Sequence, residues 1–295
     1  MRAAVLYGPN ASARDLRPFE SQDVIWLNAL PNSLDDCDAI LIFGGDGTIH
    51  RHLSDLVRLQ RPVLIVPSGS GNDFARSIGV PKVRDAVYAW KTFLAKRSNT
   101  RAVDLGIIAS KGSETSPIYF SCLAGIGIGN EAARRASAMP RWLRANGGYA
   151  AGLLQTLPHF TPVETTIRSR ATSTSEMQNH PRKAVTLAAF ANTPYYGGGM
   201  RIAPRARMNS GLLDACIIEG MNPFKLFCLF PTVYFGRHLN IKAVEYFPVF
   251  SARLETEIPV DVYADGEFVC QTPVEISAQP AALPVIVPEK EKQAG

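Results

Sequence analysis

The chain has 295 residues, of which 46% are hydrophobic and 19% are charged. This composition excludes a disordered or fibrous protein, and the length predicts two domains, each large enough for its own core. The formal net charge of +5 is modest, and no basic run alternates with aromatic residues as in nucleic-acid modules, so we expect no nucleic-acid partner.

The five cysteines are scattered and lack the spacing of a metal or redox site, which is typical of reduced thiols in a cytosolic protein. The first apolar run meets Gly8 and Pro9 too early to provide the core of a signal peptide, and no stretch is long enough for a transmembrane helix. We therefore predict a cytoplasmic protein that associates peripherally with a membrane surface.

The first hundred residues alternate short apolar runs with helical patterns, which predicts an open, doubly wound α/β domain. Strands are expected over residues 3–7, 24–27, 39–43 and 63–66. The spacing of Val87, Trp90 and Leu94 predicts an amphipathic helix over residues 83–96. Near Asn99 the pattern changes from alternating strands and helices to strands and turns, so residues 1–99 form the predicted nucleotide-binding domain.

Two glycine-rich bends follow two of these apolar runs. The first extends from Gly44 to Thr48 and the second from Ser68 to Asp73, and a helical pattern follows each. Glycine lets the backbone approach a ligand closely, and the amides at a helix start attract phosphate. Because parallel strands end at the same edge of a sheet, we expect both bends to converge on one crevice. The sequence therefore predicts a phosphate site and, by extension, a nucleotide site.

The remainder, residues 100–295, is dense in predicted strands and turns. This density predicts an antiparallel, β-sandwich-like domain for the substrate. Strands are expected over residues 101–108, 118–124, 165–170, 184–191, 212–218, 244–254, 260–263, 274–277 and 283–287, with helical patches over 130–157 and 223–235. The predicted fold class is α/β plus β, with the active site in the cleft between the two domains.

The two bends, taken in order with three later motifs, resemble the catalytic domain shared by soluble bacterial diacylglycerol kinases, sphingosine kinases and ceramide kinases. The later motifs are the run from Tyr195 to Met200 before Ile202-Ala203-Pro204, the run Gly211-Leu212-Leu213-Asp214, and the triplet Asp265-Gly266-Glu267. This ordered set extends over nearly the whole chain. The resemblance implies a two-domain lipid kinase that uses ATP and Mg²⁺.

The resemblance assigns the nucleotide contacts to three loops. A short hydroxyl such as that of Ser70 suits contact with a phosphate. The first loop departs from the usual Asn-Pro-x-Ser/Ala-Gly run of the family, so we expect some contacts there to be weaker or redistributed. The loops comprise Gly8, Pro9, Asn10 and Ala11; Gly44, Gly45, Asp46, Gly47 and Thr48; and Ser68, Gly69, Ser70, Gly71, Asn72 and Asp73.

Asp46 has two interpretations. Aspartate is favoured as the N-cap of a helix, which would be a structural role. A carboxylate beside phosphates is repelled unless a cation lies between them, which favours a role in holding Mg²⁺. In the resembled kinases this carboxylate belongs to an acidic, magnesium-bearing network, and Asp73 and Asp104 are candidates for the same network. Asp104 lies in an apolar predicted strand, where a buried carboxylate needs partners.

The Asp265-Gly266 pair by itself predicts a two-residue hairpin turn without a function. Phosphoryl transfer to an alcohol requires a group that accepts the hydroxyl proton, and kinases use a positioned carboxylate. The resemblance gives this role to an acid of the triplet. We assign it to Glu267 and keep Asp265 as the alternative, so the candidate catalytic residues are Glu267, Asp265 and Asp46.

Family members with a structural magnesium have an aspartate just before the glycine of the run that begins here at Gly211. Ser210 stands at that position, and Arg207 and Leu212 would supply backbone carbonyls as further ligands. A neutral hydroxyl is a weaker ligand than a carboxylate for a hard divalent ion. We therefore expect this site to hold a metal poorly.

A basic aromatic cluster consists of Arg134, Arg135, Arg141, Trp142 and Arg144. The cluster adjoins an apolar stretch, so it fits either a solvated helix face or an interfacial contact with a membrane.

Taken together, the sequence predicts an ATP-dependent lipid kinase that phosphorylates the primary hydroxyl of diacylglycerol or a related lipid alcohol. Two alternatives stay open. An NAD kinase shares the first bend but should carry an Asn-x-Gly-x-Leu-Gly run in place of Ser68 to Phe74. A noncatalytic nucleotide or lipid sensor would fit the altered loop at Gly8 and the serine at position 210. Assembly as a homodimer is also left open.

Overall fold

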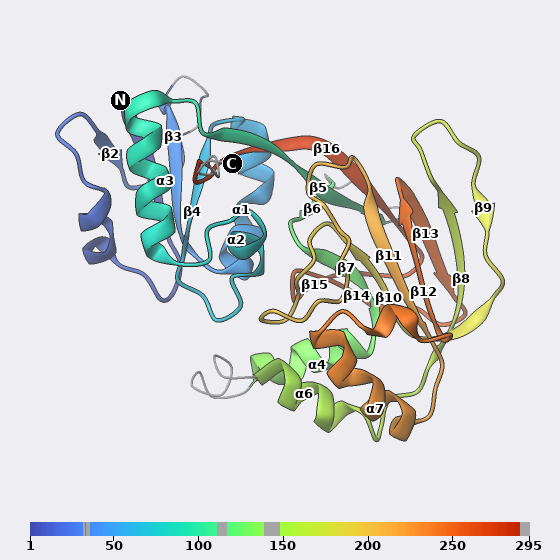
Figure 1. Ribbon diagram of the computed structural model, residues 1–295. Helices are drawn as coiled ribbons and strands as arrows, with labels where there is room; N and C mark the ends of the chain where they lie inside the picture. The colour runs from blue at the N-terminus through green and yellow to red at the C-terminus, as the bar shows by residue number, and fades with distance from the viewer. Residues whose placement is uncertain (32, 34–35, 111–116, 139–147, 290–295) are drawn as a thin grey trace, which may run out of the picture. The chain divides into compact units, whose positions relative to one another are not determined.

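The computed structural model describes the chain except residues 32, 34–35, 111–116, 139–147 and 290–295, and it divides into two compact units (Figure 1). Unit 1 contains Met1–Val103 and the chain from Ala281 onward, and unit 2 contains Asp104–Pro280. The sequence analysis instead places all of residues 100–295 in the second domain. The difference arises because strand β16 (Val274–Ile286) begins in unit 2 and ends in unit 1, where Val285 pairs in parallel with Val63.

Unit 1 is built on a parallel sheet with the strand order β16–β4–β3–β1–β2. Its own strands are β1 (Arg2–Tyr7), β2 (Ile25–Leu27), β3 (Ala39–Gly44) and β4 (Val63–Pro67). Every residue of β3 and β4 is buried, as expected for strands that are covered on both faces. Strand β2 lies on one side of β1, and β3 and β4 lie on the other. The sheet therefore has a topological switch point between β1 and β3, where open α/β sheets bind their ligands.

The helices of unit 1 pack on this sheet (Figure 1). They are the 3-10 helix η1 (Ala13–Phe19) and the α-helices α1 (Asp46–Leu59), α2 (Asp73–Ser77) and α3 (Val83–Lys96). Helix α1 contacts β3, and α3 contacts β4 and η1. The fully buried Trp90 of α3 donates its indole N–H to the carbonyl oxygen of Phe19, at 2.9 Å. The predicted doubly wound α/β architecture is confirmed.

Unit 2 is dominated by antiparallel strands. The strands follow the order β15–β14–β7–β10–β8–β13–β16, with β11 between β10 and β12, β5 beside β6 and β16, and β9 beside β8. A core that includes Ile126, Phe190, Leu213, Leu254 and Ile276 is sealed from water. The predicted antiparallel, sandwich-like architecture is confirmed. The strands are β5 (Thr100–Ser110), β6 (Ile118–Phe120), β7 (Leu123–Gly127), β8 (Val163–Arg170), β9 (Gln178–Asn179), β10 (Lys183–Ala191), β11 (Leu213–Glu219), β12 (Val244–Val249), β13 (Ser251–Thr256), β14 (Asp261–Ala264) and β15 (Glu267–Gln271).

Two predicted strands of unit 2 are interrupted for identifiable reasons. The strand expected over residues 118–124 breaks between β6 and β7 because the amides of Ser121 and Cys122 donate to a side chain, the carboxylate of Asp265. The strand expected over residues 244–254 breaks at Phe250 because β12 pairs with β11, whereas β13 pairs with β8 and β16.

The helices of unit 2 are α4 (Ile128–Ser137), α6 (Gly148–Thr156), α7 (Pro223–Tyr234) and the 3-10 helix η3 (His238–Asn240), and the three α-helices lie near one another in Figure 1. In the described part of the range 130–157, the expected helical patch contains the separate helices α4 and α6. In the described part of the chain, no helix combines the length and the apolar character needed to cross a membrane.

Candidate active site

The loops that follow β1 and β3 pack against each other at the switch point of unit 1. The amide of Gly8 donates to the carbonyl oxygen of Phe43 at 2.8 Å. A Cβ atom at Gly8 would lie 2.6 Å from Oγ1 of Thr48, and the same threonine fills the space beside Gly44. Thr48 is buried, and its side chain packs beside both Gly8 and Gly44. Glycine is required at position 8 because a side chain would push the loops apart.

The bends after β3 and β4 touch backbone to backbone. A Cβ atom at Gly45 would lie 2.8 Å from Cα of Gly69, and one at Gly69 would lie 2.5 Å from Cα of Gly45. The amide of Ser68 also donates to the carbonyl oxygen of Gly44, at 3.2 Å. The structure therefore brings together the two bends that the sequence analysis expects to converge.

Asn72 shapes the second bend. Its backbone is left-handed, with φ of 54°, and its side chain is bonded twice to Gly69. The side-chain oxygen accepts the amide of Gly69 at 2.9 Å, and the side-chain nitrogen donates to the carbonyl of Gly69 at 2.8 Å. The amides of Ser70 and Gly71 have no acceptor within the described residues. An exposed Ser70 and two unused amides in a tight bend are suited to an anionic ligand.

Asp46 connects the first bend to the second. It is the first residue of α1, whose N-cap is Gly45, but its side chain accepts hydrogen bonds from a different helix. One carboxylate oxygen accepts the amide of Asp73 at 3.1 Å, and the other accepts the amide of Phe74 at 3.0 Å. These are the first amides of α2, so Asp46 caps α2 across the bend. The capping interpretation of Asp46 thus describes a real contact, but with a helix that starts 27 residues later.

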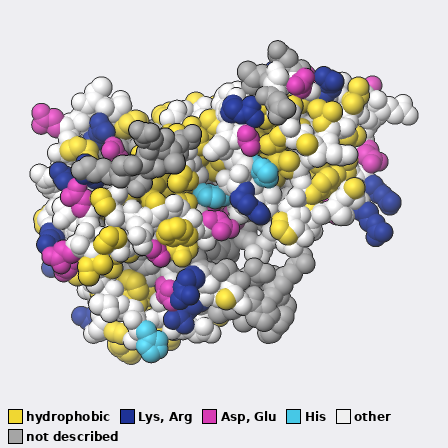
Figure 2. All heavy atoms as spheres, turned by 180° about the vertical axis from the view of Figure 1, so that it is seen from behind, with side chains coloured by type: hydrophobic (Ala, Val, Ile, Leu, Met, Phe, Trp, Pro, Cys, Tyr) yellow, Lys and Arg dark blue, Asp and Glu magenta, His cyan; other side chains and the backbone are white. Residues whose placement is uncertain are grey.

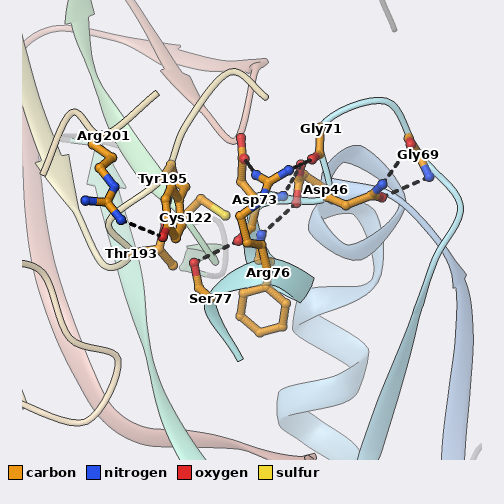
Figure 3. Close-up of polar contacts among 12 residues, drawn as sticks. Asp46, Gly69, Gly71, Asp73, Arg76, Ser77, Cys122, Thr193, Tyr195 and Arg201 are labelled. Atoms are coloured by element: carbon orange, nitrogen blue, oxygen red, sulfur yellow. Dashed lines mark hydrogen bonds and ion pairs between the residues drawn. The ribbon is translucent and has the colours of Figure 1, made fainter. Parts of the chain in front are cut away.

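Asp73 and Arg76 lie beside Asp46, as Figure 3 shows. The carboxylate of Asp73 is almost completely buried and forms an ion pair with the guanidinium of Arg76. Arg76 also donates to the carbonyl of Gly71, at 3.2 Å. Arg76 thus places a positive charge at the second bend. The sequence analysis does not assign it a role, although its position three residues after Asp73 on a helix is the signal that could have identified it.

In unit 2, the carboxylate of Asp265 is held by four hydrogen bonds. One oxygen accepts the amide and the hydroxyl of Ser121, at 2.7 and 3.0 Å. The other accepts the amides of Cys122 and Leu123, at 2.8 and 3.2 Å. Asp265 is buried, and these bonds fix the β14–β15 hairpin to the start of β7.

The hairpin turn itself is as the sequence predicts. Asp265 and Gly266 both have positive φ, 51° and 91°, and Ala264 pairs with Glu267 across the turn. Glu267 is the first residue of β15, is exposed, and has no polar side-chain partner among the described residues. The two acids of the triplet therefore have opposite environments, since Asp265 is anchored and Glu267 is open.

Asp104, the first residue of unit 2, has the partners that its burial requires. Its carboxylate accepts the amide of Gly211 at 2.7 Å. The side-chain amide of Asn192 donates to the backbone carbonyls of Asp104 and Ser121, at 2.8 and 2.9 Å. Asn192 thus connects β5 to the segment that anchors Asp265. Asn192 lies three residues before the glycine-rich run that begins at Tyr195, but its connecting role depends on contacts distant in sequence.

The hydroxyl of Ser210 contacts the carbonyl oxygens expected as metal ligands. It lies 2.9 Å from the oxygen of Arg207 and 3.1 Å from that of Leu212. These contacts close the loop within the chain and offer no charged ligand, so this set of donors does not fit a divalent ion. Within the described ranges, no group of three or more His, Cys, Asp or Glu side chains is placed to hold a metal.

The predicted basic aromatic cluster is only partly described. Arg141, Trp142 and Arg144 lie outside the described residues. Arg134 and Arg135 both bind Glu131, at 2.7 and 3.0 Å, and the hydrogen bond from Arg134 lowers the pKa of that carboxyl group. Both arginines line a cavity of about 560 Å³, together with Phe160, Val260 and Tyr263 among others. The cavity therefore adjoins the strand that leads to Asp265.

Comparison with known proteins agrees with this architecture. The model of the "Diacylglycerol kinase catalytic domain" matches residues 20–108, and that of the "YegS C-terminal NAD kinase beta sandwich-like domain" matches residues 123–287. A diacylglycerol kinase of Mycobacterium tuberculosis is 34% identical over 252 residues, which are 85% of this chain and 77% of the relative. The chain belongs to the diacylglycerol kinase family of lipid kinases.

Other proteins named as diacylglycerol kinases match a similar length of this chain at lower identity. A diacylglycerol kinase of Bacillus subtilis is 24% identical over 263 residues, 88% of this chain and 81% of the relative. A crystal structure of a diacylglycerol kinase from Bacillus anthracis superimposes with a TM-score of 0.66 at 19% identity, covering 97% of this chain and 96% of that one. The match to the solved structure shows that the fold extends over both units.

Proposed function

We propose that this lipid kinase transfers the γ-phosphoryl group of ATP to the primary hydroxyl of diacylglycerol or a related lipid alcohol. The observation that carries the proposal is the backbone contact between Gly45 and Gly69, beside the unused amides of Ser70 and Gly71. Amides presented by glycine-rich turns are suited to phosphate groups. The relatives named as diacylglycerol kinases support the choice of acceptor.

The proposal assigns the phosphates of the donor to unit 1. The bend amides would bind phosphate oxygens, and Arg76 would offset charge that develops during transfer. Mg²⁺ is usually held by one or two carboxylates together with substrate phosphates, and Asp46 is the candidate carboxylate at the bends, since Asp73 is almost completely buried in an ion pair with Arg76. When bound there, Mg²⁺ would neutralise phosphate charge. The loop at Ser210 has no part in this proposal.

The proposal assigns the lipid alcohol to unit 2, where Glu267 accepts its proton. The alcohol oxygen then bonds to the γ-phosphorus, the bond from that phosphorus to the bridging oxygen breaks, and ADP leaves with the electron pair. Glu267 is favoured because its oxygens have no partner in the described chain, whereas both oxygens of Asp265 already accept two hydrogen bonds each. Asp265 stays the alternative, since its anchored position is well defined.

A transfer assay with radiolabelled ATP tests the acceptor. The panel contains diacylglycerol, monoacylglycerol, sphingosine, ceramide and NAD, and each product is separated by chromatography. We expect label in the lipid phosphate of diacylglycerol or a close analogue. Label in NADP would support the NAD kinase alternative. Nucleotide binding by calorimetry without transfer to any acceptor would support the noncatalytic sensor.

The identity of the base is tested with Glu267→Gln and Asp265→Asn. Glutamine preserves size and the turn but cannot accept the proton, so we expect the rate of transfer to fall at least about a hundredfold with ATP affinity unchanged. Thermal unfolding of both variants is the control, because Asp265→Asn also removes hydrogen-bond acceptors from Cys122 or Ser121. A nearly normal rate in Glu267→Gln, with an inactive but stable Asp265→Asn, would move the assignment to Asp265.

A further inference from the structure

Helix α7 of unit 2 is apolar on two opposite faces. Leu226, Leu229 and Val233 are buried on one face. The other carries an exposed stripe, defined by Phe224, Phe227, Cys228 and Pro231 and continued by Phe235 just beyond the helix. The exposed fractions of the three phenylalanines are 75%, 54% and 72%.

This stripe is a contiguous surface. Residues 224, 227, 228, 231 and 235 follow the spacing of one face of a helix, so their side chains lie side by side. Isolated exposed apolar residues are ordinary, but clustered aromatic residues mark a surface that binds something. The core face of α7 already explains why the helix packs on unit 2, and it does not require the second apolar face.

The charged side chains of the segment that carries the stripe have a single sign. Residues 220–244 contain three basic residues, Lys225, Arg237 and Lys242, and no acidic residue. All three are exposed. The acids that flank this segment, Glu219 and Glu245, both form ion pairs with Lys183. By contrast, the face opposite to the view of Figure 1 shows basic and acidic side chains interspersed (Figure 2).

We propose that the α7 stripe docks the protein on the surface of a membrane that contains anionic lipid, with the phenylalanines in the interface and the basic residues at the headgroups. An apolar aromatic face bordered by lysine and arginine without acids is the pattern of interfacial helices. A protein partner would need its own acidic and apolar surface, whereas an anionic bilayer offers both. This inference rests on the proposed lipid kinase function, because a water-soluble acceptor would give no reason to bind a bilayer.

Helix α7 is also connected to the candidate site within unit 2, through Val233 on its buried face. The amide of Arg201 donates to the carbonyl of Val233 at the end of α7, and Arg201 contacts the hydroxyl of Tyr195 at 3.4 Å (Figure 3). The hydroxyl of Thr193, next to Asn192, donates to the carbonyl of Tyr195. The helix that carries the stripe is thus joined by hydrogen bonds to the segment next to Asn192.

Cys228 provides a probe within the stripe. It is the one exposed cysteine of the described chain, and Cys270, which is half-buried, can be replaced by serine. An environment-sensitive fluorophore on Cys228 should shift to the blue when vesicles of equal parts phosphatidylcholine and phosphatidylglycerol are added. A matched control carries the same fluorophore at Ile258→Cys in a Cys228→Ser background, since Ile258 is also exposed and lies at a distant place in the sequence. The control should not shift.

A second test removes the stripe. The triple variant Phe224→Ser, Phe227→Ser, Phe235→Ser should lose at least about tenfold in vesicle affinity by co-sedimentation, as expected from losing three apolar anchors. The matched triple variant Ile25→Ser, Tyr88→Ser, Ile258→Ser removes exposed apolar groups elsewhere and should bind as the wild type does. Transfer to a short-chain, water-soluble acceptor should survive in both, with unchanged melting temperatures.

The outcomes separate the docking inference from the proposed function. If no acceptor is phosphorylated but vesicles still bind through the stripe, the function is wrong and the docking surface stands. If transfer is intact and the stripe variant binds vesicles as tightly as the wild type, the docking inference is overturned. It is also overturned by a combination of two results: the wild type forms a dimer in ultracentrifugation that the stripe variant does not form, and the fluorophore on Cys228 does not respond to vesicles. The stripe would then join two copies of this chain.

Discussion

Replacement of Asp46 by asparagine tests the structural and the chemical role of this residue at once. Its carboxylate accepts the amides of Asp73 and Phe74, both of which belong to buried residues. Asparagine keeps one acceptor oxygen but turns an N–H₂ group toward the second amide. The variant therefore leaves one N–H donor facing another donor. Asp and Asn are usually equivalent as helix caps because a cap needs only one acceptor oxygen, whereas Asp46 uses two.

The magnitude follows from the number of amides that lose an acceptor. One unpaired buried donor costs about 1–3 kcal/mol, so we expect Asp46→Asn to lower the free energy of unfolding of unit 1 by that amount. Asp46→Ala leaves two such donors, and fraying of the short helix α2 should limit the loss to about 2–4 kcal/mol. Loss of the negative charge of Asp46 beside the two glycine-rich bends should also reduce the rate of phosphoryl transfer at least about a hundredfold in the folded variant.

Urea unfolding followed by tryptophan fluorescence measures the first effect, because Trp26 and Trp90 both lie in unit 1. The matched control is Asp55→Asn, which removes the same charge from the same helix. Asp55 is half exposed and forms an ion pair with Arg58 at 3.1 Å, so its loss should change stability by less than about 0.5 kcal/mol. An Asp46→Asn variant as stable as this control would refute the capping argument, and near-normal turnover would refute the chemical one.

Three further predictions concern packing, the loop at Ser210 and pH. Gly69→Ala should destabilise unit 1 by about 1–3 kcal/mol, because the added Cβ would meet the backbone of Gly45. The same variant should bind ATP more weakly in calorimetry, and unchanged binding would contradict the close approach of the two bends. Ser210→Ala should lower the melting temperature, whereas chelation of divalent ions should leave that of the wild type unchanged; a drop on chelation would show that the loop holds a metal. Burial lowers the pKa of His238 below 6.5, so the unfolded chain takes up the proton first and stability should fall as the pH decreases below about 6.5. His238→Gln should flatten that decline in urea midpoints across pH, and an equally steep decline would assign it to other groups.

The parts of the fold that the sequence could predict are those with local signals. The strands of unit 1 are continuous apolar runs, and each glycine bend ends one of them, so both the strands and the convergence of the bends followed from local pattern. The same holds for the hairpin turn at Asp265 and Gly266, whose residue types favour positive φ.

The parts that the sequence could not predict depend on distant contacts. Strand β16 is expected as two separate strands, over residues 274–277 and 283–287, yet the chain continues as one strand with a local irregularity at Ala281, whose φ is 51°. Its two halves pair with different units, which no local pattern records. The connecting role of Asn192 was missed for the same reason, since only the folded chain brings Asp104 and Ser121 near it. Arg76 differs, because its partners Asp73 and Gly71 are close to it in sequence.

The acids of the candidate site differ in whether a substitution can test their role in catalysis without also destabilising the fold. Asp46 and Asp265 each accept amides from a segment distant in sequence, so each builds the structure that presents it. Loss of activity on replacing either one is therefore ambiguous unless stability is measured in the same variant. Glu267 has no such partner in the described chain, so its replacement changes chemistry with little cost to the fold. Glu267 is thus the acid whose variant gives the most direct evidence about the proposed transfer of the alcohol proton.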